Sequence, residues 1–324
     1  MIISIIQRSI MQGIPLLYGS TGEIITEKSG NLNLGIPGIM YVGAISGVIG
    51  AFLYEQSVET LNPVLAVLIP LFSSIIGSLF MGLIYCLLTV TLHSNQNVTG
   101  LALTTFGVGF GNFFGGSLIK LTGSDTPSIA LVQTSRIFKT TLPFADKLGV
   151  IGELFFSYSF LAYAAIIIAI LASVFFKRTR RGLNLRAIGE NPATADAAGI
   201  NVNKYKYAAT CIGSVIAGLG GLYYVMDYAD GIWSNNAFGD RGWLAIALVI
   251  FAVWKPNFSI IGSILFGGLL IAYNYVNVTF EQQELFKMAP YVVTILVLVI
   301  ISMRRKKENQ PPASLGLSYF REER

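Results

Sequence analysis

A series of long apolar segments is the feature that most constrains how this chain can fold. A helix that crosses a bilayer needs about 20 mostly apolar residues, since its backbone must satisfy its own hydrogen bonds there. The chain is 53% hydrophobic and only 12% charged. The sequence therefore predicts an all-α, polytopic transmembrane helical bundle with nine spans, or eight to ten, and short re-entrant or cytoplasmic coupling helices. The expected spans are 3–20, 34–54, 63–92, 97–119, 154–176, 207–228, 242–254, 257–279 and 286–303.

The polar interval 177–206 indicates how these spans are oriented. It lies between two spans and carries seven Lys or Arg residues against two acids. Basic residues concentrate in cytoplasmic loops, so this interval is expected in the cytoplasm. Four further spans return the C-terminus to the same side. We expect one transmembrane domain at 1–303 in a bacterial-type cytoplasmic membrane, followed by a cytoplasmic tail at 304–324.

The middle of that interval has the pattern of a short helix. Asn191 and Pro192 are typical of a turn, the run from Ala193 to Ala198 contains good helix formers, and Gly199 is a typical helix stop. A helix with such small side chains could occupy a groove on another protein. The alternative is a surface loop whose charges only set the topology.

Residues 22–40 interrupt the apolar pattern with acids, amides and glycines. Non-helical backbone near a membrane is tolerated where protein or water satisfies its polar groups, so such a segment often borders a pathway. We expect Glu23, Asn31 and Asn33 to line a substrate path, with both asparagines partly buried. An ordinary surface loop is the alternative.

Two further asparagines, Asn112 and Asn274, lie inside apolar segments. Polar groups within a membrane are expensive and tend to face a bundle interior or a cavity. We include both in the candidate substrate path, with hydrogen bonding between helices as the alternative.

Glycines recur at four-residue spacing in two of the expected spans. Gly107, Gly111 and Gly115 form one series, and Gly43 and Gly47 form another pair. Small residues at this spacing let helices approach closely in lipid. Helix packing is the preferred interpretation, and a flexible gate near Gly107 is the alternative.

The sequence lacks the motifs that mark several classes of enzyme. No G-x-x-x-x-G-K-S/T loop is present to hold nucleotide phosphates, and neither H-E-x-x-H nor G-x-S-x-G occurs. We predict no enzyme activity, no catalytic residue, no metal and no cofactor in this chain. The net charge of +5 is explained by membrane orientation, so no nucleic-acid partner is expected.

Three stretches resemble one family of transporters. The sequence GENPATADAAGI at 189–200 resembles the cytoplasmic coupling segment of ABC importer permeases in the branched-chain amino acid, ribose and nucleoside group. The sequence GEIITEKSGNLNLGIPGIMYVGA at 22–44 and the tail PPASLGLSYFREER at 311–324 are similar to the nucleoside branch of that group. Pro37 departs from the family pattern, since many relatives have an acidic residue there.

The resemblance implies a permease subunit of an ATP-driven importer, with nucleosides as the expected solute. Sugars or branched-chain amino acids are the alternative solutes, and a partner-independent secondary carrier or channel is the alternative mechanism. The implied partners are an ATPase that uses the ATP, a second permease subunit (a paralogue or a copy of this chain), an extracytoplasmic solute-binding protein and the lipid bilayer. The residues expected to couple to the ATPase are Gly189, Glu190, Asn191, Ala195, Ala198 and Gly199.

Overall fold

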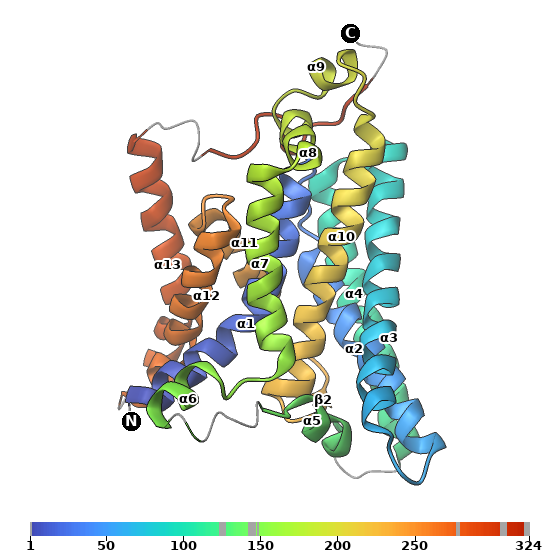
Figure 1. Ribbon diagram of the computed structural model, residues 1–324, viewed down its shortest axis with the longest axis vertical. Helices are drawn as coiled ribbons and strands as arrows, with labels where there is room; N and C mark the ends of the chain where they lie inside the picture. The colour runs from blue at the N-terminus through green and yellow to red at the C-terminus, as the bar shows by residue number, and fades with distance from the viewer. Residues whose placement is uncertain are drawn as a thin grey trace.

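Long helices dominate the structure, a computed structural model that describes residues 2–122, 128–141, 147, 149–276, 279–304 and 310–320 (Figure 1). The mostly helical class predicted from the sequence is confirmed. The elements in order are α1 (Ile2–Glu27), α2 (Ile36–Ser57), α3 (Pro63–Cys86), η1 (Leu87–Thr91), α4 (Gln96–Thr122), β1 (Ser128–Ala130), α5 (Val132–Phe138), α6 (Gly149–Phe155), α7 (Phe160–Arg178), α8 (Arg180–Glu190), α9 (Pro192–Ala197), α10 (Val202–Tyr223), η3 (Tyr224–Tyr228), β2 (Ile232–Ser234), α11 (Arg241–Phe251), α12 (Pro256–Ile271), η4 (Ala272–Tyr275) and α13 (Phe280–Arg304).

Seven helical segments among the described residues are long and apolar enough to cross a membrane. Each overlaps one of the nine predicted spans. The remaining two predictions fall on α1, whose apolar character is lowered by Gln7, Arg8 and Gln12, and on α11, which has only 11 residues. The count of nine spans therefore stays a prediction. The seven segments are Ile36–Ser57, Pro63–Thr91, Gln96–Lys120, Phe160–Arg178, Val202–Tyr228, Pro256–Tyr275 and Gln282–Ile300.

The two ends of the bundle carry different structures (Figure 1). One end, which we call the α9 face, carries α8, α9 and residues 310–320. The opposite end, the ribbon face, carries α5, α6 and a two-stranded antiparallel ribbon in which Ile129 of β1 pairs with Trp233 of β2. The all-α expectation missed this ribbon, because strands of three residues are too short to show an alternating pattern.

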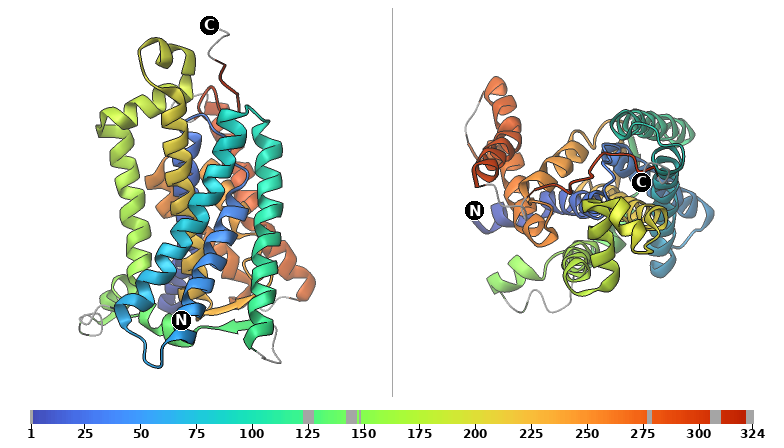
Figure 2. Two further views of the ribbon diagram at one scale, coloured as in Figure 1. Left: turned by 90° about the vertical axis from the view of Figure 1, so that its right-hand side faces the viewer. Right: turned by 90° about the horizontal axis from the view of Figure 1, so that it is seen from above.

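The centre of the bundle is built from α1, α2 and α10. Viewed along the bundle, α12 and α13 lie on one side and α3 and α4 on the other, with α1 between them (Figure 2). A Cβ atom added to Gly43 would lie 2.5 Å from the Cα atom of Gly218, and one added to Gly107 would lie 2.5 Å from the carbonyl oxygen of Gly38. The glycine series therefore permits helix packing, as preferred from the sequence.

The basic stretch Lys177–Arg186, which the sequence analysis used only as a signal of orientation, contains the beginning of a helix. Residues from Arg180 onward form α8, whose first turn is capped by the Thr179 hydroxyl accepting from the Gly182 N–H group at 3.0 Å. Its buried side includes Leu185 and Ile188. This helix ends at Glu190, directly before α9, so the predicted coupling residues lie in or beside two short helices.

Candidate functional site

Between α1 and α2 the chain forms a non-helical segment, residues 28–35, which we call the polar loop. Gly30 adopts φ +87°, a left-handed conformation that glycine accepts without steric cost. Asn31 and Asn33 are fully buried. The polar loop is therefore an interior segment, and the alternative of an ordinary surface loop is wrong.

Side chains of α3 and α4 satisfy the backbone of the polar loop. The Leu32 N–H group donates to the Gln96 Oε1 atom at 2.7 Å, and the Tyr85 hydroxyl donates to the Leu32 carbonyl oxygen at 2.6 Å. The Thr104 hydroxyl donates to the Leu34 carbonyl oxygen at 2.8 Å. Buried backbone groups without partners are costly, so these bonds stabilise the non-helical conformation inside the bundle.

The buried asparagines of the polar loop connect it to α1 and α10. The Asn33 N–H group donates to Glu23 Oε1 at 3.0 Å, and Asn31 Nδ2 donates to the Thr210 hydroxyl at 3.0 Å. Glu23 Oε2, Asn31 Oδ1 and Asn33 Nδ2 have no hydrogen-bond partner among the described residues. Glu23, Asn31 and Asn33 thus lie together, and their hydrogen bonds anchor the loop in the bundle, while their role in a substrate path stays a prediction.

A second buried acid, Glu27, lies one turn beyond Glu23 on α1. Its carboxylate accepts a hydrogen bond from Trp254 Nε1 in the turn between α11 and α12. Trp254 and Val253 have φ values of 52° and 55°, a region that residues other than glycine rarely adopt. A strained turn held by a buried hydrogen bond is typical of functional positions.

Nearer the ribbon face, Asn112 belongs to a separate group of three residues, the Tyr41 cluster (Tyr41, Asn112 and Asn236). The Tyr41 hydroxyl donates to Asn112 Oδ1 at 2.5 Å, and Asn112 Nδ2 donates to Asn236 Oδ1 at 2.9 Å. The Asn236 N–H group closes the ring by donating to the Tyr41 hydroxyl at 2.9 Å. Asn112 is only half-buried and Asn236 is exposed.

Aromatic rings surround the Tyr41 cluster. The Tyr41 ring lies 5.1 Å from that of Trp233 in an edge-to-face arrangement, and Phe238 contacts both Tyr41 and Tyr224. The Arg241 guanidinium lies 4.4 Å above the Tyr224 ring. Sequence reasoning missed these aromatic residues, because each is unremarkable alone and only folding brings them together. The rings of Tyr41, Trp233 and Phe238 are buried, so the accessible groups of the cluster are the amides of Asn112 and Asn236.

Asn274 stands apart from both groups of predicted path residues. It lies in η4, is exposed, and has no hydrogen bond to Glu23, Asn31, Asn33 or Asn112 among the described residues. The five predicted path residues therefore divide into three in the polar loop region, one in the Tyr41 cluster and one isolated position.

The predicted coupling residues divide by exposure. Glu190, Asn191, Ala198 and Gly199 are exposed, whereas Gly189 and Ala195 are buried. The Asn191 side chain caps α9 by accepting from the Thr194 N–H group at 3.0 Å, and Gly199 has φ +82° after the helix end. The predicted short helix is confirmed. Its exposed residues lie on the α9 face, where a partner could contact them.

Gly189, at the end of α8, packs directly against the polar loop. A Cβ atom at this position would lie 2.4 Å from the Lys28 carbonyl oxygen, so only glycine permits this approach. The Gly189 carbonyl accepts from the Ser314 N–H group at 2.9 Å and from the Ser314 hydroxyl at 2.6 Å. Three segments distant in sequence therefore meet at Gly189.

Residues 310–320 form an extended strap across the α9 face. The Gly316 N–H group donates to the Gly30 carbonyl oxygen at 3.1 Å, which connects the strap to the polar loop. The Tyr319 hydroxyl donates to Asp196 Oδ2 in α9 at 2.8 Å, and the Phe320 ring lies 4.5 Å from His93. A signal for this packing was present in the sequence: residues 311–320 are mostly apolar or aromatic, whereas the residues on either side are mostly charged.

No group of three or more His, Cys, Asp or Glu residues suited to holding a metal occurs among the described residues. The candidate site has three features: a half-exposed pair of amides packed on buried aromatic rings, a buried polar loop and an exposed short helix connected to that loop.

The chain is similar to known transport proteins over nearly its whole length. The model of a family described as the permease component of branched-chain amino acid transport systems matches residues 5–298. A nucleoside ABC transporter permease, NupC of Lactococcus lactis, is 32% identical, with 91% of each chain covered. A putative glucose ABC transporter permease of Haloferax volcanii is 30% identical, covering 95% of this chain and 94% of its own. The guanosine permease NupQ of Bacillus subtilis is 29% identical, covering 91% and 90%.

Proposed function

We propose a function from one premise: this chain belongs to the family of permease components of branched-chain amino acid transport systems. It is the membrane-spanning permease subunit of an ABC importer, and it is not an enzyme. Membership implies an ATPase and a solute-binding protein as partners. The solute, the paths of coupling and the orientation are the proposed parts.

The proposed solute is a nucleoside. The observation that carries this assignment is similarity over about nine-tenths of the chain to permeases named for nucleosides and for guanosine. The similarity to a putative glucose permease favours sugar as the second candidate, and a nucleoside itself contains a pentose.

The Tyr41 cluster is proposed as a contact point for the nucleoside. Its amides offer both hydrogen-bond donors and acceptors, which the edge of a base requires. Tyr41 and Trp233 are themselves buried, and they hold the amides of Asn112 and Asn236 in place. The half-exposed position of Asn112 supports access, in contrast to the full burial of Asn31.

Coupling is proposed to run from α9 through Gly189 to the polar loop. An ATPase that moves the exposed residues of α9 would also move α8, because the two helices share the cap at Asn191. The contact between Gly189 and Lys28 would transmit that motion to the segment before α2. The strap at 310–320 contacts α9 and the polar loop together, which supports a second, parallel connection.

The α9 face is proposed to be cytoplasmic. Five basic residues lie at the end of α7 and along α8 on this face, in agreement with the positive-inside rule. This orientation places the Tyr41 cluster toward the outside, where a solute-binding protein would deliver the nucleoside. It also retains the proposed single transmembrane domain at 1–303, its nine spans and a cytoplasmic tail.

A second permease subunit, either a paralogue or another copy of this chain, is proposed to complete the pathway. Only 11% of an 18-residue apolar stretch of α13 is buried, and Leu296 and Val299 are among its exposed residues. This surface must contact lipid or another apolar protein face.

The test is uptake by a reconstituted complex containing this chain, the partner permease, the ATPase and the binding protein. We expect ATP-dependent uptake of labelled guanosine, with glucose and leucine as competitors that fail to reduce it. An ATPase variant unable to hydrolyse ATP is the control. Uptake of glucose but not guanosine would establish the second candidate, and uptake by the isolated chain without ATP would establish a secondary carrier.

A further inference from the structure

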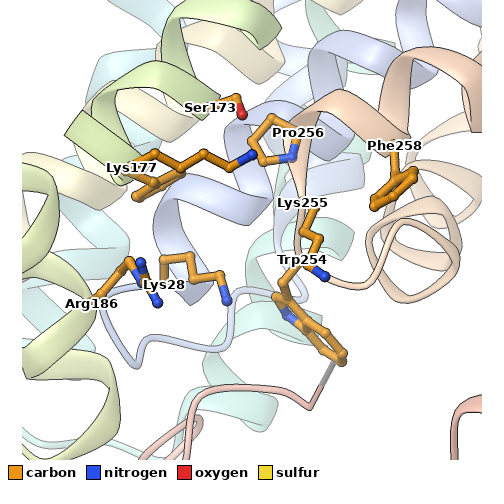
Figure 3. Close-up of a pocket in the computed structure, with 9 residues that line it drawn as sticks. Lys28, Ser173, Lys177, Arg186, Trp254, Lys255, Pro256 and Phe258 are labelled. Carbon is orange, nitrogen blue, oxygen red and sulfur yellow. The ribbon is translucent and has the colours of Figure 1, made fainter. Parts of the chain in front are cut away.

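A cavity of about 390 Å³ on the α9 face is surrounded by four cationic side chains (Figure 3). The cations come from four separate places: Lys28 follows α1, Lys177 lies in the last turn of α7, Arg186 lies in α8, and Lys255 precedes α12. Figure 3 shows Lys28 and Arg186 close together on one side, with Lys177 and Lys255 on other sides of the same space. We call this cavity the cationic pocket.

Lys28, Lys177 and Arg186 form no ion pair with any carboxylate of the described residues. Burial, and next the guanidinium of Arg186, lower the pKa of Lys28 to about 8, while Glu190 and Glu27 act in the opposite direction. Bringing like charges together costs free energy unless an anion lies between them.

The remaining wall of the pocket is aromatic and apolar. Trp254, Phe176 and Phe258 contribute to it, and Phe258 is 52% exposed. The Lys255 ammonium lies 5.8 Å from the centre of the Phe258 ring. A ligand here would meet cations on one side and an apolar surface on the other.

The pocket lies where two candidate membrane spans meet the α9 face, the level at which lipid head groups are expected. Phe160–Arg178 ends beside it, and Pro256–Tyr275 begins beside it, and both are candidate membrane spans. Basic pockets between helices on the cytoplasmic side of membranes suit phosphate head groups. Arg and Lys together provide both bidentate and single-point hydrogen bonds to phosphate oxygens.

We propose that the cationic pocket binds a phosphate group, carried either by an anionic phospholipid head group or by a soluble phosphate compound. The bound phosphate would bridge Arg186 of α8 and Lys28 at the start of the polar loop. Trp254, in the pocket wall, also donates to Glu27 at the end of α1. Occupancy would therefore fasten α8, the polar loop and the α11–α12 turn to one another.

The experiment uses the full chain in lipid nanodiscs and measures binding, which does not depend on the transported solute. Native mass spectrometry compares retention of phosphatidylglycerol with that of phosphatidylcholine with the same acyl chains. A separate arm adds inorganic phosphate to protein in phosphatidylcholine and follows the thermal unfolding midpoint. These arms distinguish a lipid source from a soluble source of phosphate.

The test variant is Lys177→Gln with Arg186→Gln, and the matched control is Arg178→Gln with Arg180→Gln. All four side chains are exposed, and both pairs remove two positive charges from the same face. We expect the wild type and the control to bind phosphatidylglycerol in preference to phosphatidylcholine, or to bind inorganic phosphate. The test variant should lose about tenfold in affinity for the same probe.

If the wild type and the control prefer phosphatidylglycerol and the test variant does not, the ligand is a lipid. A rise in the unfolding midpoint with inorganic phosphate that only the test variant loses would assign a soluble one. If neither probe binds, or if both pairs of substitutions reduce binding equally, the proposal is overturned and the pocket contributes only general surface charge. None of these outcomes bears on whether the solute is a nucleoside.

Discussion

The polar loop and the Tyr41 cluster both contain asparagine side chains inside a membrane protein, yet they differ in every physical respect. Asn31 and Asn33 are fully buried and bond to two helices, Asn31 to Thr210 of α10 and Asn33 to Glu23 of α1. Asn112 is half-buried, and its partner Asn236 is exposed. The first group is enclosed by protein, whereas the second is open on one side.

This difference separates two roles that the sequence presented as one substrate path. A side chain whose hydrogen bonds fix a non-helical loop is poorly placed to exchange those bonds with a passing solute. A half-exposed side chain such as Asn112 can do so at low cost, because water already competes for its hydrogen bonds. We therefore expect the polar loop to transmit motion and the Tyr41 cluster to contact the solute.

The largest expected effect is at the junction between α8 and the polar loop. Gly189→Val places a side chain 2.4 Å from the Lys28 carbonyl, so the two segments must separate. Overpacking of this kind costs about 1–3 kcal/mol, which would correspond to roughly 5- to 150-fold in coupled rate. Solute-stimulated ATP hydrolysis by the reconstituted complex measures the loss.

Gly109→Val is the matched control, since a Cβ at Gly109 meets no heavy atom within 4 Å. It should leave both membrane insertion and ATP hydrolysis near the wild-type values. Normal coupling in Gly189→Val would show that the polar loop is not connected to α9, and the comparison between the two groups would lose its basis.

A smaller effect is expected at the bond between the α11–α12 turn and α1. Trp254→Phe keeps the aromatic bulk but removes the N–H group that donates to Glu27. A buried acceptor left without its donor costs about 1–3 kcal/mol. The thermal unfolding midpoint in detergent should fall, and solute affinity should remain unchanged.

Trp243→Phe provides the control for this change, because no hydrogen bond from Trp243 to a side chain such as Glu27 is present in the described structure. If Trp254→Phe changed solute affinity but not stability, Glu27 would belong to the solute path and not to the coupling connection.

In the Tyr41 cluster, a substitution should change solute affinity and leave stability nearly unchanged, the reverse of Trp254→Phe. Asn112→Ala removes one hydrogen-bonding group worth about 0.5–1.5 kcal/mol. The KM for nucleoside uptake should therefore rise roughly 3- to 10-fold, while the unfolding midpoint changes little. Initial uptake rates over a range of guanosine concentrations give this value.

Asn274→Ala serves as the reference for Asn112, since Asn274 is exposed and distant from the cluster. Its KM should equal that of the wild type. Equal behaviour of the two variants would contradict a solute-contacting role for Asn112.

The smallest effect is expected in the strap. Tyr319→Phe removes the hydroxyl that donates to Asp196, a part-buried bond worth about 1 kcal/mol. Coupled ATP hydrolysis should fall by a few-fold at most, because Ser314 and Gly316 still hold the strap. Tyr273→Phe, in η4, is the control. An unchanged rate in Tyr319→Phe would limit the strap to a structural role.

Local patterns allowed much of the α9 region to be anticipated from the sequence. Asn191, Pro192 and Gly199 predicted the beginning and end of a short helix, and the structure has α9 at Pro192–Ala197. Capping and left-handed stops depend on a few neighbouring residues, so they can be read in one dimension. α8 was missed, since its apolar positions are few and lie among basic residues.

The Tyr41 cluster was less accessible to such reasoning. Asn112 was identified as an embedded polar residue, but its partners Tyr41 and Asn236 lie 71 and 124 positions away in the chain. No local pattern connects them. The strap was similar, because Ser314 meets Gly189 across 125 residues.

The sequence by itself determined that this is a helical membrane protein with a short helix in a basic interval, because hydropathy, capping and charge distribution act over short stretches of chain. The tertiary structure decided which polar residues are enclosed and which are accessible. That decision depends on glycine-mediated approach of helices and on hydrogen bonds between distant segments, as at Gly189 and Lys28. Burial is a property of the packed bundle, so the separate roles of Asn31 and Asn112 emerge only there.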